Sequence, residues 1–239
     1  MNCICCGSSG LNKSPATIAP FVARRVFGRE LRTCHSMQCQ YCGTLFSDVR
    51  YSNDQLRKLY TGYRGAEYTT QRQRYEPDYA NPPAHDYNDE IDKFLRPHIP
   101  YQPTILDWGG DDGSNTPFQE YPHDIYDINT HPVKPDWKYD LVVCSNLLEH
   151  VPYPAQTLEE IKPFVGKTLY LEIPMGPMSD TDYITKAEWH EHINFFTEQS
   201  LFILLCRANL CMTDWIRHPV NAKYYTYLLM LTCEVNCGR

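Results

Sequence analysis

The chain has 239 residues, 42% of them hydrophobic, which is enough for one large domain or for one ordinary domain with a small appendage. It contains no run of 18 apolar residues, and its first residues, MNCICCGSSG, lack the basic and apolar regions of a signal peptide. We therefore expect a soluble cytoplasmic protein without a membrane span.

The net charge of −7 is divided unevenly along the chain. Residues 1–75 carry 11 Lys and Arg against 4 Asp and Glu, whereas residues 76–239 carry 11 against 25. A basic front and an acidic back indicate two units with different tasks, unless the signs of the surface charges are accidental.

Residues 1–48 are expected to form a small zinc-binding unit. Six of the eleven cysteines fall in the first 42 residues, and four of them make two Cys-x-x-Cys turns, each followed by a glycine. Four thiolates in this arrangement suit one tetrahedral, structural Zn²⁺, and without a secretion signal a disulfide framework is the weaker interpretation. Cys5 or Cys34 could replace a neighbouring ligand. The predicted ligands are Cys3, Cys6, Cys39 and Cys42.

Residues 49–100 are predicted to form a helical, tyrosine-rich bridge. Asn53-Asp54 can begin a short helix that carries Leu56 and Leu59, and a second helix is expected from Asn88 to Arg96. Tyrosines between the helices could line a ligand pocket or hold the small unit against the large one, and both interpretations stay open. These tyrosines are Tyr60, Tyr63, Tyr68, Tyr75, Tyr79 and Tyr87.

Residues 101–239 alternate between strand and helix patterns. This alternation predicts an α/β domain with a mostly parallel sheet and helices on both faces. Ligands of such sheets lie at the carboxyl ends of the strands, where we expect the site residues Asp107 to Gly113, Asp127, Ser145 to His150, and Glu172 to Met175. The expected strands are 104–108, 124–128, 139–145, 167–173, 211–216 and 224–232, and the expected helices are 114–120, 154–163 and 197–208.

The sequence ILDWGGDDGSN at 105–115 predicts a strand, a bare glycine loop and a helix capped by Ser114. Because Asp111 and Asp112 would repel a pyrophosphate, the loop favours a cationic ligand such as S-adenosylmethionine over a dinucleotide. Asp127 closes the next strand, where one carboxylate can accept hydrogen bonds from both hydroxyls of a ribose.

These motifs together resemble a known family. ILDWGGDDG, YDI at 126–128, YDLVVCSNLLEHV at 139–151 and KTLYLEIP at 167–174 are similar to the Rossmann-like S-adenosylmethionine-dependent methyltransferases. The paired Cys-x-x-Cys unit, LRKLYTGY at 56–63 and EWHEHINFFTEQSL at 188–201 resemble a subgroup that acts on sugars and nucleotide-linked sugars. In the sugar C-methyltransferases, a zinc-binding unit precedes the cofactor domain and a Tyr-His-Glu-His run lies in the active site.

The resemblance implies a cofactor site and a reacting end for the substrate. Asp111 stands where the family has its middle glycine, and the long C-terminal domain of the C-methyltransferases is missing, so oxygen methylation and carbon methylation both stay open. The implied cofactor-binding residues are Asp107, Gly109, Gly110 and Gly113 at the methionine part, Asp127 at the ribose, and Ser145 and Asn146 beside the cofactor. The implied catalytic run is His190, Glu191 and His192.

An independent chemical argument favours His192 as the general base. A sugar hydroxyl is a poor nucleophile until a base accepts its hydrogen bond, and histidine serves best near neutral pH. Glu191 is expected to orient His192 or to bind substrate; in an extended segment His190 and His192 share one side. The alternatives are a His-x-His metal pair or structural histidines. Glu149 and His150 are interpreted as residues that hold a loop.

The preferred function is therefore methyl transfer to a sugar or nucleotide-linked sugar in surface polysaccharide or deoxysugar biosynthesis. The basic front could attract a diphosphate-linked substrate. One alternative is an RNA methyltransferase whose zinc unit grips the backbone, which the acidic cofactor domain disfavours. The other is a non-catalytic docking protein that keeps the fold. The predicted domains are 1–48, 49–100 and 101–239; the oligomeric state is open.

Overall fold

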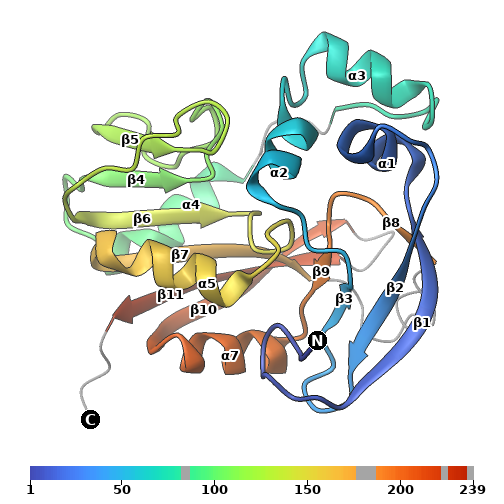
Figure 1. Ribbon diagram of the computed structural model, residues 1–239. Helices are drawn as coiled ribbons and strands as arrows, with labels where there is room; N and C mark the ends of the chain where they lie inside the picture. The colour runs from blue at the N-terminus through green and yellow to red at the C-terminus, as the bar shows by residue number, and fades with distance from the viewer. Residues whose placement is uncertain (82–86, 176–186, 222–225, 236–239) are drawn as a thin grey trace.

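The computed structural model describes residues 1–81, 87–175, 187–221 and 226–235. Its strands form two sheets, one of six strands and one of five, that lie side by side (Figure 1). Within the described residues, no helix is both long and apolar enough to span a bilayer.

The larger sheet has the strand order β10-β11-β7-β6-β4-β5. Four adjacent strands, β7, β6, β4 and β5, are parallel to one another. β11 runs antiparallel to both β7 and β10. The predicted α/β Rossmann-like fold is thus confirmed, with a hairpin added at the edge. The strands are β4 (Ile105–Trp108), β5 (His123–Tyr126), β6 (Tyr139–Ser145), β7 (Val165–Met175), β10 (Leu210–Asn221) and β11 (Thr226–Val235).

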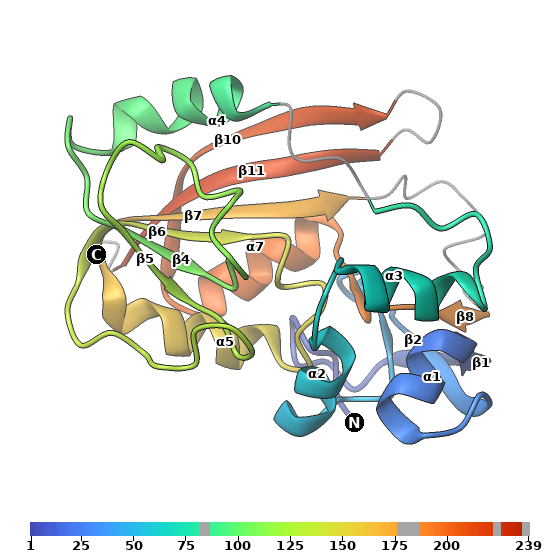
Figure 2. The same ribbon diagram turned by 90° about the horizontal axis from the view of Figure 1, so that it is seen from above.

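Helices cover both faces of this sheet (Figure 2). Side chains alternate along a strand, so Leu141 and Val143 of β6 pack toward α4 (Asn88–Leu95), whereas Val142 packs toward the other face. That other face is covered by α5 (Pro154–Ile161) and α7 (Glu198–Arg207). Short 3₁₀ turns, Arg96–His98 and Lys162–Phe164, follow α4 and α5.

The smaller sheet has the order β8-β1-β2-β3-β9. Its centre is built by β1 (Leu11–Ile18), β2 (Arg32–Cys39) and β3 (Leu45–Ser47). The edge strands β8 (Glu188–Trp189) and β9 (Asn194–Phe195) come from the part of the chain that was predicted to belong to the cofactor domain. The domain boundaries at 48/49 and 100/101 stay predictions, but residues 188–195 complete the N-terminal sheet.

Three helices pack beside the smaller sheet. α2 (Asn53–Tyr60) begins near the predicted residue, with Ser52 as its N-cap, and buries Leu56 and Leu59 as expected. α3 (Ala66–Gln73) carries the buried Tyr68. α1 (Pro20–Phe27) lies within the predicted zinc unit and was not anticipated.

The predicted helix at 114–120 is wrong, and so is the capping role of Ser114. The backbone N–H of Ser114 instead donates to the side chain of Asp112 in a turn. Thr116 precedes Pro117, a position that disfavours helical backbone, and Phe118 has a left-handed φ of 57°. The segment from the glycine loop to β5 therefore stays irregular.

Candidate active site and metal centre

The glycine loop after β4 is shaped by close packing rather than by a following helix. A Cβ at Gly110 would overlap the carboxyl group of Asp107, and a Cβ at Gly109 would lie 3.0 Å from the side chain of Leu147. The loop therefore folds over the end of β4 and touches the segment that follows β6. This contact places the glycine loop beside residues 147–150.

Asp111 occupies a backbone position that favours glycine. Its φ of 53° is left-handed, a conformation that aspartate tolerates better than most residues. The Asp111 carbonyl accepts a hydrogen bond of 2.6 Å from the hydroxyl of Thr130. The departure from the family pattern noted in the sequence thus preserves the backbone turn and adds a carboxylate to the loop.

Asp107 is almost completely buried at the end of β4. Its side chain is 5% exposed, and Oδ2 accepts a hydrogen bond of 2.7 Å from the hydroxyl of Thr116. Burial raises the pKa of Asp107 to about 6, although the Thr116 bond works in the opposite direction. A cation that binds nearby would recover the cost of ionising this carboxyl group.

Asp127, the predicted ribose ligand, follows β5 and closes a turn. Its Oδ1 accepts backbone hydrogen bonds of 2.7 Å from Asn129 and 3.1 Å from Thr130. These bonds use one carboxylate oxygen and orient the other. A ribose at this place would therefore meet Oδ2 of a carboxylate that is already fixed.

Ser145 and Asn146 lie at the end of β6, next to the buried carboxylate of Glu172, one of the strand-end residues expected near the site. Asn146 has a φ of 49°, and its side-chain amide donates to Oε1 of Glu172. The same carboxylate accepts hydrogen bonds of 2.8 Å from Tyr87 and 2.9 Å from Tyr170. Glu172 thus holds the strained turn at Asn146, and its position at the end of β7 was the available signal.

A cluster of Glu149, His150 and His192 lies beyond the same strand end. One ligand atom from each residue lies within 4.8 Å of the others. Nε2 of His150 is 3.6 Å from Oε1 of Glu149, and the rings of His150 and His192 meet edge to face with centroids 4.5 Å apart. The predicted catalytic histidine is thus brought to the residues that the sequence analysis treated as loop-holding.

Backbone hydrogen bonds hold His192 at this cluster. The N–H groups of Ile193 and Asn194 donate to the carbonyl of Glu149 at 2.9 and 3.0 Å. The side-chain amide of Asn194 donates to the carbonyls of Leu148 and Val151. The segment after β8 is therefore tied to the segment after β6 directly after His192.

Burial is the largest cause of the pKa shifts of Glu149 and His150. It raises the pKa of Glu149 to about 8 and lowers the pKa of His150 to about 4. Both shifts favour the neutral form, because neither charge has a compensating partner of sufficient strength. The positive charge of Arg64 contributes to the lower pKa of His150.

The other two residues of the predicted catalytic run lie in different surroundings. Glu191 is buried and forms an ion pair with Arg72 of α3, and it also accepts a hydrogen bond of 2.9 Å from Tyr68. His190 is 37% exposed and faces Glu76 and Glu188 at 3.4 and 3.3 Å. The segment is a bend rather than a strand, so the three side chains separate.

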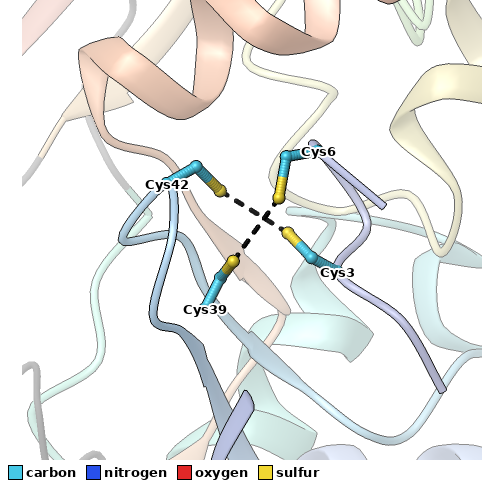
Figure 3. A group of neighbouring side chains, drawn as sticks. All are labelled: Cys3, Cys6, Cys39 and Cys42. Atoms are coloured by element: carbon cyan, nitrogen blue, oxygen red, sulfur yellow. Dashed lines mark hydrogen bonds between the residues drawn. The ribbon is translucent and has the colours of Figure 1, made fainter. Parts of the chain in front are cut away.

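The four predicted zinc ligands converge on one point (Figure 3). The sulfur atoms of Cys3 and Cys42 are 3.5 Å apart, as are those of Cys6 and Cys39. Tetrahedral zinc with Zn–S bonds of about 2.3 Å separates its sulfur ligands by about 3.8 Å, so the cluster fits the ion. Cys5, the alternative ligand, instead faces the hydroxyl of Thr44 at 3.7 Å.

The family model described as a methyltransferase domain matches residues 73–213, more than half of the chain. The chain therefore belongs to the methyltransferase domain family and is an enzyme of the S-adenosylmethionine-dependent class. None of the curated proteins with which the chain was compared matches it.

Two solved structures share the fold. The 1,6-didemethyltoxoflavin-N1-methyltransferase of Burkholderia thailandensis is 16% identical, with a TM-score of 0.53 over 82% of this chain and 97% of that one. The magnesium protoporphyrin IX methyltransferase of Synechocystis PCC 6803 is 12% identical, with a TM-score of 0.50 over 77% of this chain and 100% of that one. At these identities the likeness concerns the fold alone.

Proposed function

We propose that the protein transfers a methyl group from S-adenosylmethionine to a hydroxyl of a sugar or nucleotide-linked sugar. The observation that carries this proposal is that the ring of His192 meets that of His150, in the segment after β6 whose Leu147 packs against Gly109 of the glycine loop. A group that activates the acceptor hydroxyl thus lies at the strand ends where the cofactor is expected.

The glycine loop and its carboxylates fit the cofactor. Asp107, the backbone of 109–113 and Asp111 would surround the positively charged methionine part, and Asp127 and the 145–146 turn would hold the nucleoside. When bound, S-adenosylmethionine supplies a methyl group on a sulfonium. His192 is the residue proposed to act on the acceptor hydroxyl, in the role of general base that the sequence favours.

Aromatic rings beside the cluster suit a sugar. Tyr60 and Tyr63 meet edge to face at 5.3 Å, and the hydroxyl of Tyr60 lies 2.8 Å from Nδ1 of His150. Such rings present flat apolar faces and hydroxyls together, which matches the two sides of a sugar ring. Tyr63 and Tyr68 also pack in the core beside the smaller sheet, so the tyrosines support both roles that were left open.

A positive charge supports a nucleotide-linked acceptor. The guanidinium of Arg64 lies over the ring of Tyr63, 5.0 Å from its centroid, and its buried Nε has no hydrogen-bond partner among the described residues. A diphosphate would satisfy this donor and the charge. We therefore place the carrier group of the substrate beside Arg64 and the sugar beside the tyrosines.

The test begins with calorimetric titration of S-adenosylhomocysteine and continues with methylation assays on nucleoside-diphosphate sugars. His192→Ala should reduce turnover at least about 100-fold while leaving the Kd for S-adenosylhomocysteine unchanged. The matched control is His35→Gln, because His35 pairs with Asp48 in the smaller sheet and is 39% exposed. Loss of S-adenosylhomocysteine binding in His192→Ala, or full turnover, would contradict the assignment.

We also propose that Cys3, Cys6, Cys39 and Cys42 hold a structural Zn²⁺. Four sulfur ligands leave no open position for a substrate, so the ion would tie the first residues of the chain to the turn between β2 and β3. A zinc ion that stays on these four cysteines under mild chelation supports this role, whereas a folded, metal-free protein with four reduced cysteines would contradict it.

A further inference from the structure

The carboxylate of Glu149 is an unexplained feature of the fold. The residue is 1% exposed, and neither of its carboxyl oxygens has a hydrogen-bond partner among the described residues. Buried polar groups are nearly always satisfied, and leaving one unsatisfied costs about 1–3 kcal/mol. The buried carboxyl group of Glu149 therefore points to a bound ligand that would satisfy its oxygens.

The two histidines offer their rings at the same point. The three ligand atoms lie within 4.8 Å of one another, and Oε1 of Glu149 is 3.6 Å from Nε2 of His150. Tetrahedral zinc with bonds of about 2.0–2.1 Å separates its nitrogen and oxygen ligands by about 3.3 Å. Small side-chain movements would therefore suffice to complete a coordination shell.

An outer shell already orients His150. Its Nδ1 lies 2.8 Å from the hydroxyl of Tyr60 and 3.2 Å from the carbonyl oxygen of Glu191. Because a carbonyl only accepts, this contact favours a proton on Nδ1 and leaves the lone pair of Nε2 directed at Glu149. Metal-binding histidines typically have their second nitrogen fixed in this way.

We propose that Glu149, His150 and His192 bind one divalent transition-metal ion, Zn²⁺ in the first instance, separate from the four-cysteine site. Two histidines and one carboxylate form a three-ligand set that leaves a coordination position open. The backbone bonds from Ile193 and Asn194 to the Glu149 carbonyl hold the two halves of the set together.

The open position deepens the proposed function, on which its role rests. An acceptor hydroxyl bound to the ion has a lowered pKa and a fixed orientation beside the glycine loop. Its proton leaves to water, the oxygen forms the new bond to the methyl carbon, and the carbon–sulfur bond breaks with its electron pair on sulfur. In this form His192 acts as a metal ligand and the ion takes over the activation of the hydroxyl.

Metal content of the intact protein tests the site. After reconstitution with Zn²⁺ and desalting, the wild-type protein should hold two zinc ions per chain, whereas Glu149→Gln and His192→Ala should hold one. His35→Gln should keep two. With Co²⁺ as the probe, the wild type should show a nitrogen- and oxygen-type spectrum beside the thiolate bands, and Glu149→Gln should lose only the former.

Thermal unfolding, measured with and without added Zn²⁺, provides a second test that also detects a variant that folds poorly. Glu149→Gln removes the ionisable group without changing its shape, so the metal-free variant should melt at or above the wild-type temperature. Added Zn²⁺ beyond the first equivalent should raise the wild-type Tm and leave that of Glu149→Gln unchanged. One zinc per chain in the wild type, or equal zinc responses of the two proteins, would overturn the proposal.

Two further outcomes separate this proposal from the proposed function. If protein that retains only the four-cysteine zinc methylates its acceptor at the full rate while His192→Ala is inactive, the second metal site is refuted and His192 is a free base. If the protein binds the second zinc but not S-adenosylhomocysteine, the metal site stands and the proposed function fails.

Discussion

Asp107, a proposed cofactor-binding residue, shows how one buried carboxyl group can lower the stability of the free protein. Its carboxyl group is buried against Thr116 and has a pKa raised to about 6 from an ordinary value of 3.8. The folded state therefore holds the proton more tightly than the unfolded state, and stability falls as the pH rises from about 4 to 6. A positively charged cofactor would reverse this loss.

Asp107→Asn should consequently stabilise the cofactor-free protein at pH 7, by up to about 3 kcal/mol, and weaken S-adenosylhomocysteine binding. The gain should shrink as the pH falls toward 4 and vanish below about pH 3, where the wild-type carboxyl group is protonated in both states. Urea unfolding at pH 4, 5, 6 and 7 measures it. The control is Asp112→Asn: the Ser114 hydrogen bond lowers the Asp112 pKa, so this variant should lose stability toward neutral pH. A gain independent of pH would contradict the argument.

Asp127 provides a second prediction at the scale of the residue. Because its Oδ1 already accepts two backbone N–H groups, Asp127→Asn should preserve the turn and replace only the outer oxygen by an amide. The Kd for S-adenosylhomocysteine should rise by about tenfold, since one charge-assisted hydrogen bond to the ribose is lost. An unchanged Kd in a folded variant would refute the ribose assignment.

The residue types of the site could be predicted, but not their grouping. The motif His190-Glu191-His192 made His192 the candidate base, because histidine chemistry and the resemblance pointed to the same residue. That Glu191 turns away to Arg72 and Tyr68 depends on α3, whose approach has no signal in the motif itself. Likewise, Glu149 and His150 form a cluster only because a segment distant in sequence brings His192 next to them.

At the scale of the element, α7 links the two cysteine turns to the larger sheet. Thr197 caps the helix by accepting from the N–H of Ser200, and its hydroxyl donates a hydrogen bond of 2.7 Å to the carbonyl of Cys42. Arg207 at the other end donates to the carbonyl of Cys5. The helix thus satisfies backbone groups of both cysteine turns.

Thr197→Ala should therefore cost more than the loss of an ordinary cap. Ser52→Ala, which removes the exposed cap of α2, should destabilise the protein by about 0.5–1 kcal/mol. Thr197→Ala also leaves the buried carbonyl of Cys42 without this donor, so we expect about 2–4 kcal/mol. Equal losses in urea unfolding would show that the bond to Cys42 contributes nothing.

Helices and strands were predicted correctly where the apolar pattern extends over many residues. The prediction failed where proline or a left-handed residue produces a turn. The strands of the larger sheet, α2, α4, α5 and α7 follow their apolar patterns to within a few residues at most ends. The helix expected at 114–120 fails because Pro117 and the left-handed Phe118 interrupt it. α1 had the signals of a helix, with Pro20 at its start and Gly28 in the left-handed C-cap, but it lay inside a region interpreted only through its cysteines.

At the scale of the whole molecule, the two sheets are interlocked by the chain path. After the larger sheet's β7, the chain adds β8 and β9 to the smaller sheet and then continues into α7. The indole N–H of Trp189 in β8 donates to the hydroxyl of Ser36 in β2 of the same sheet. Strands of two residues have no periodicity to read, so this exchange could not be predicted from sequence. The basic residues 1–75 and the acidic residues 76–239 therefore form two regions of opposite charge in one interlocked structure.

The cysteine cluster belongs to the core of the cofactor domain as well as to its own turns. Cys3, Cys39 and Cys42 pack in one buried cluster with Leu201 and Leu205 of α7 and with residues of the larger sheet. Removing the proposed zinc would therefore leave four close sulfur atoms without their shared ligand against that core. Its effect should extend beyond residues 1–48.

Cys39→Ser should accordingly destabilise the whole chain by more than about 4 kcal/mol, or lower its Tm by about 10 °C, in a single transition. The control is Cys206→Ser, because Cys206 is an exposed free cysteine at the end of α7. Calorimetry, near-ultraviolet signals from Trp108 in β4 and the loss of S-adenosylhomocysteine binding should coincide. A separate early transition, with Trp108 and cofactor binding intact, would instead show that the zinc unit unfolds alone, and the shared core would then contribute little to coupling the two sheets.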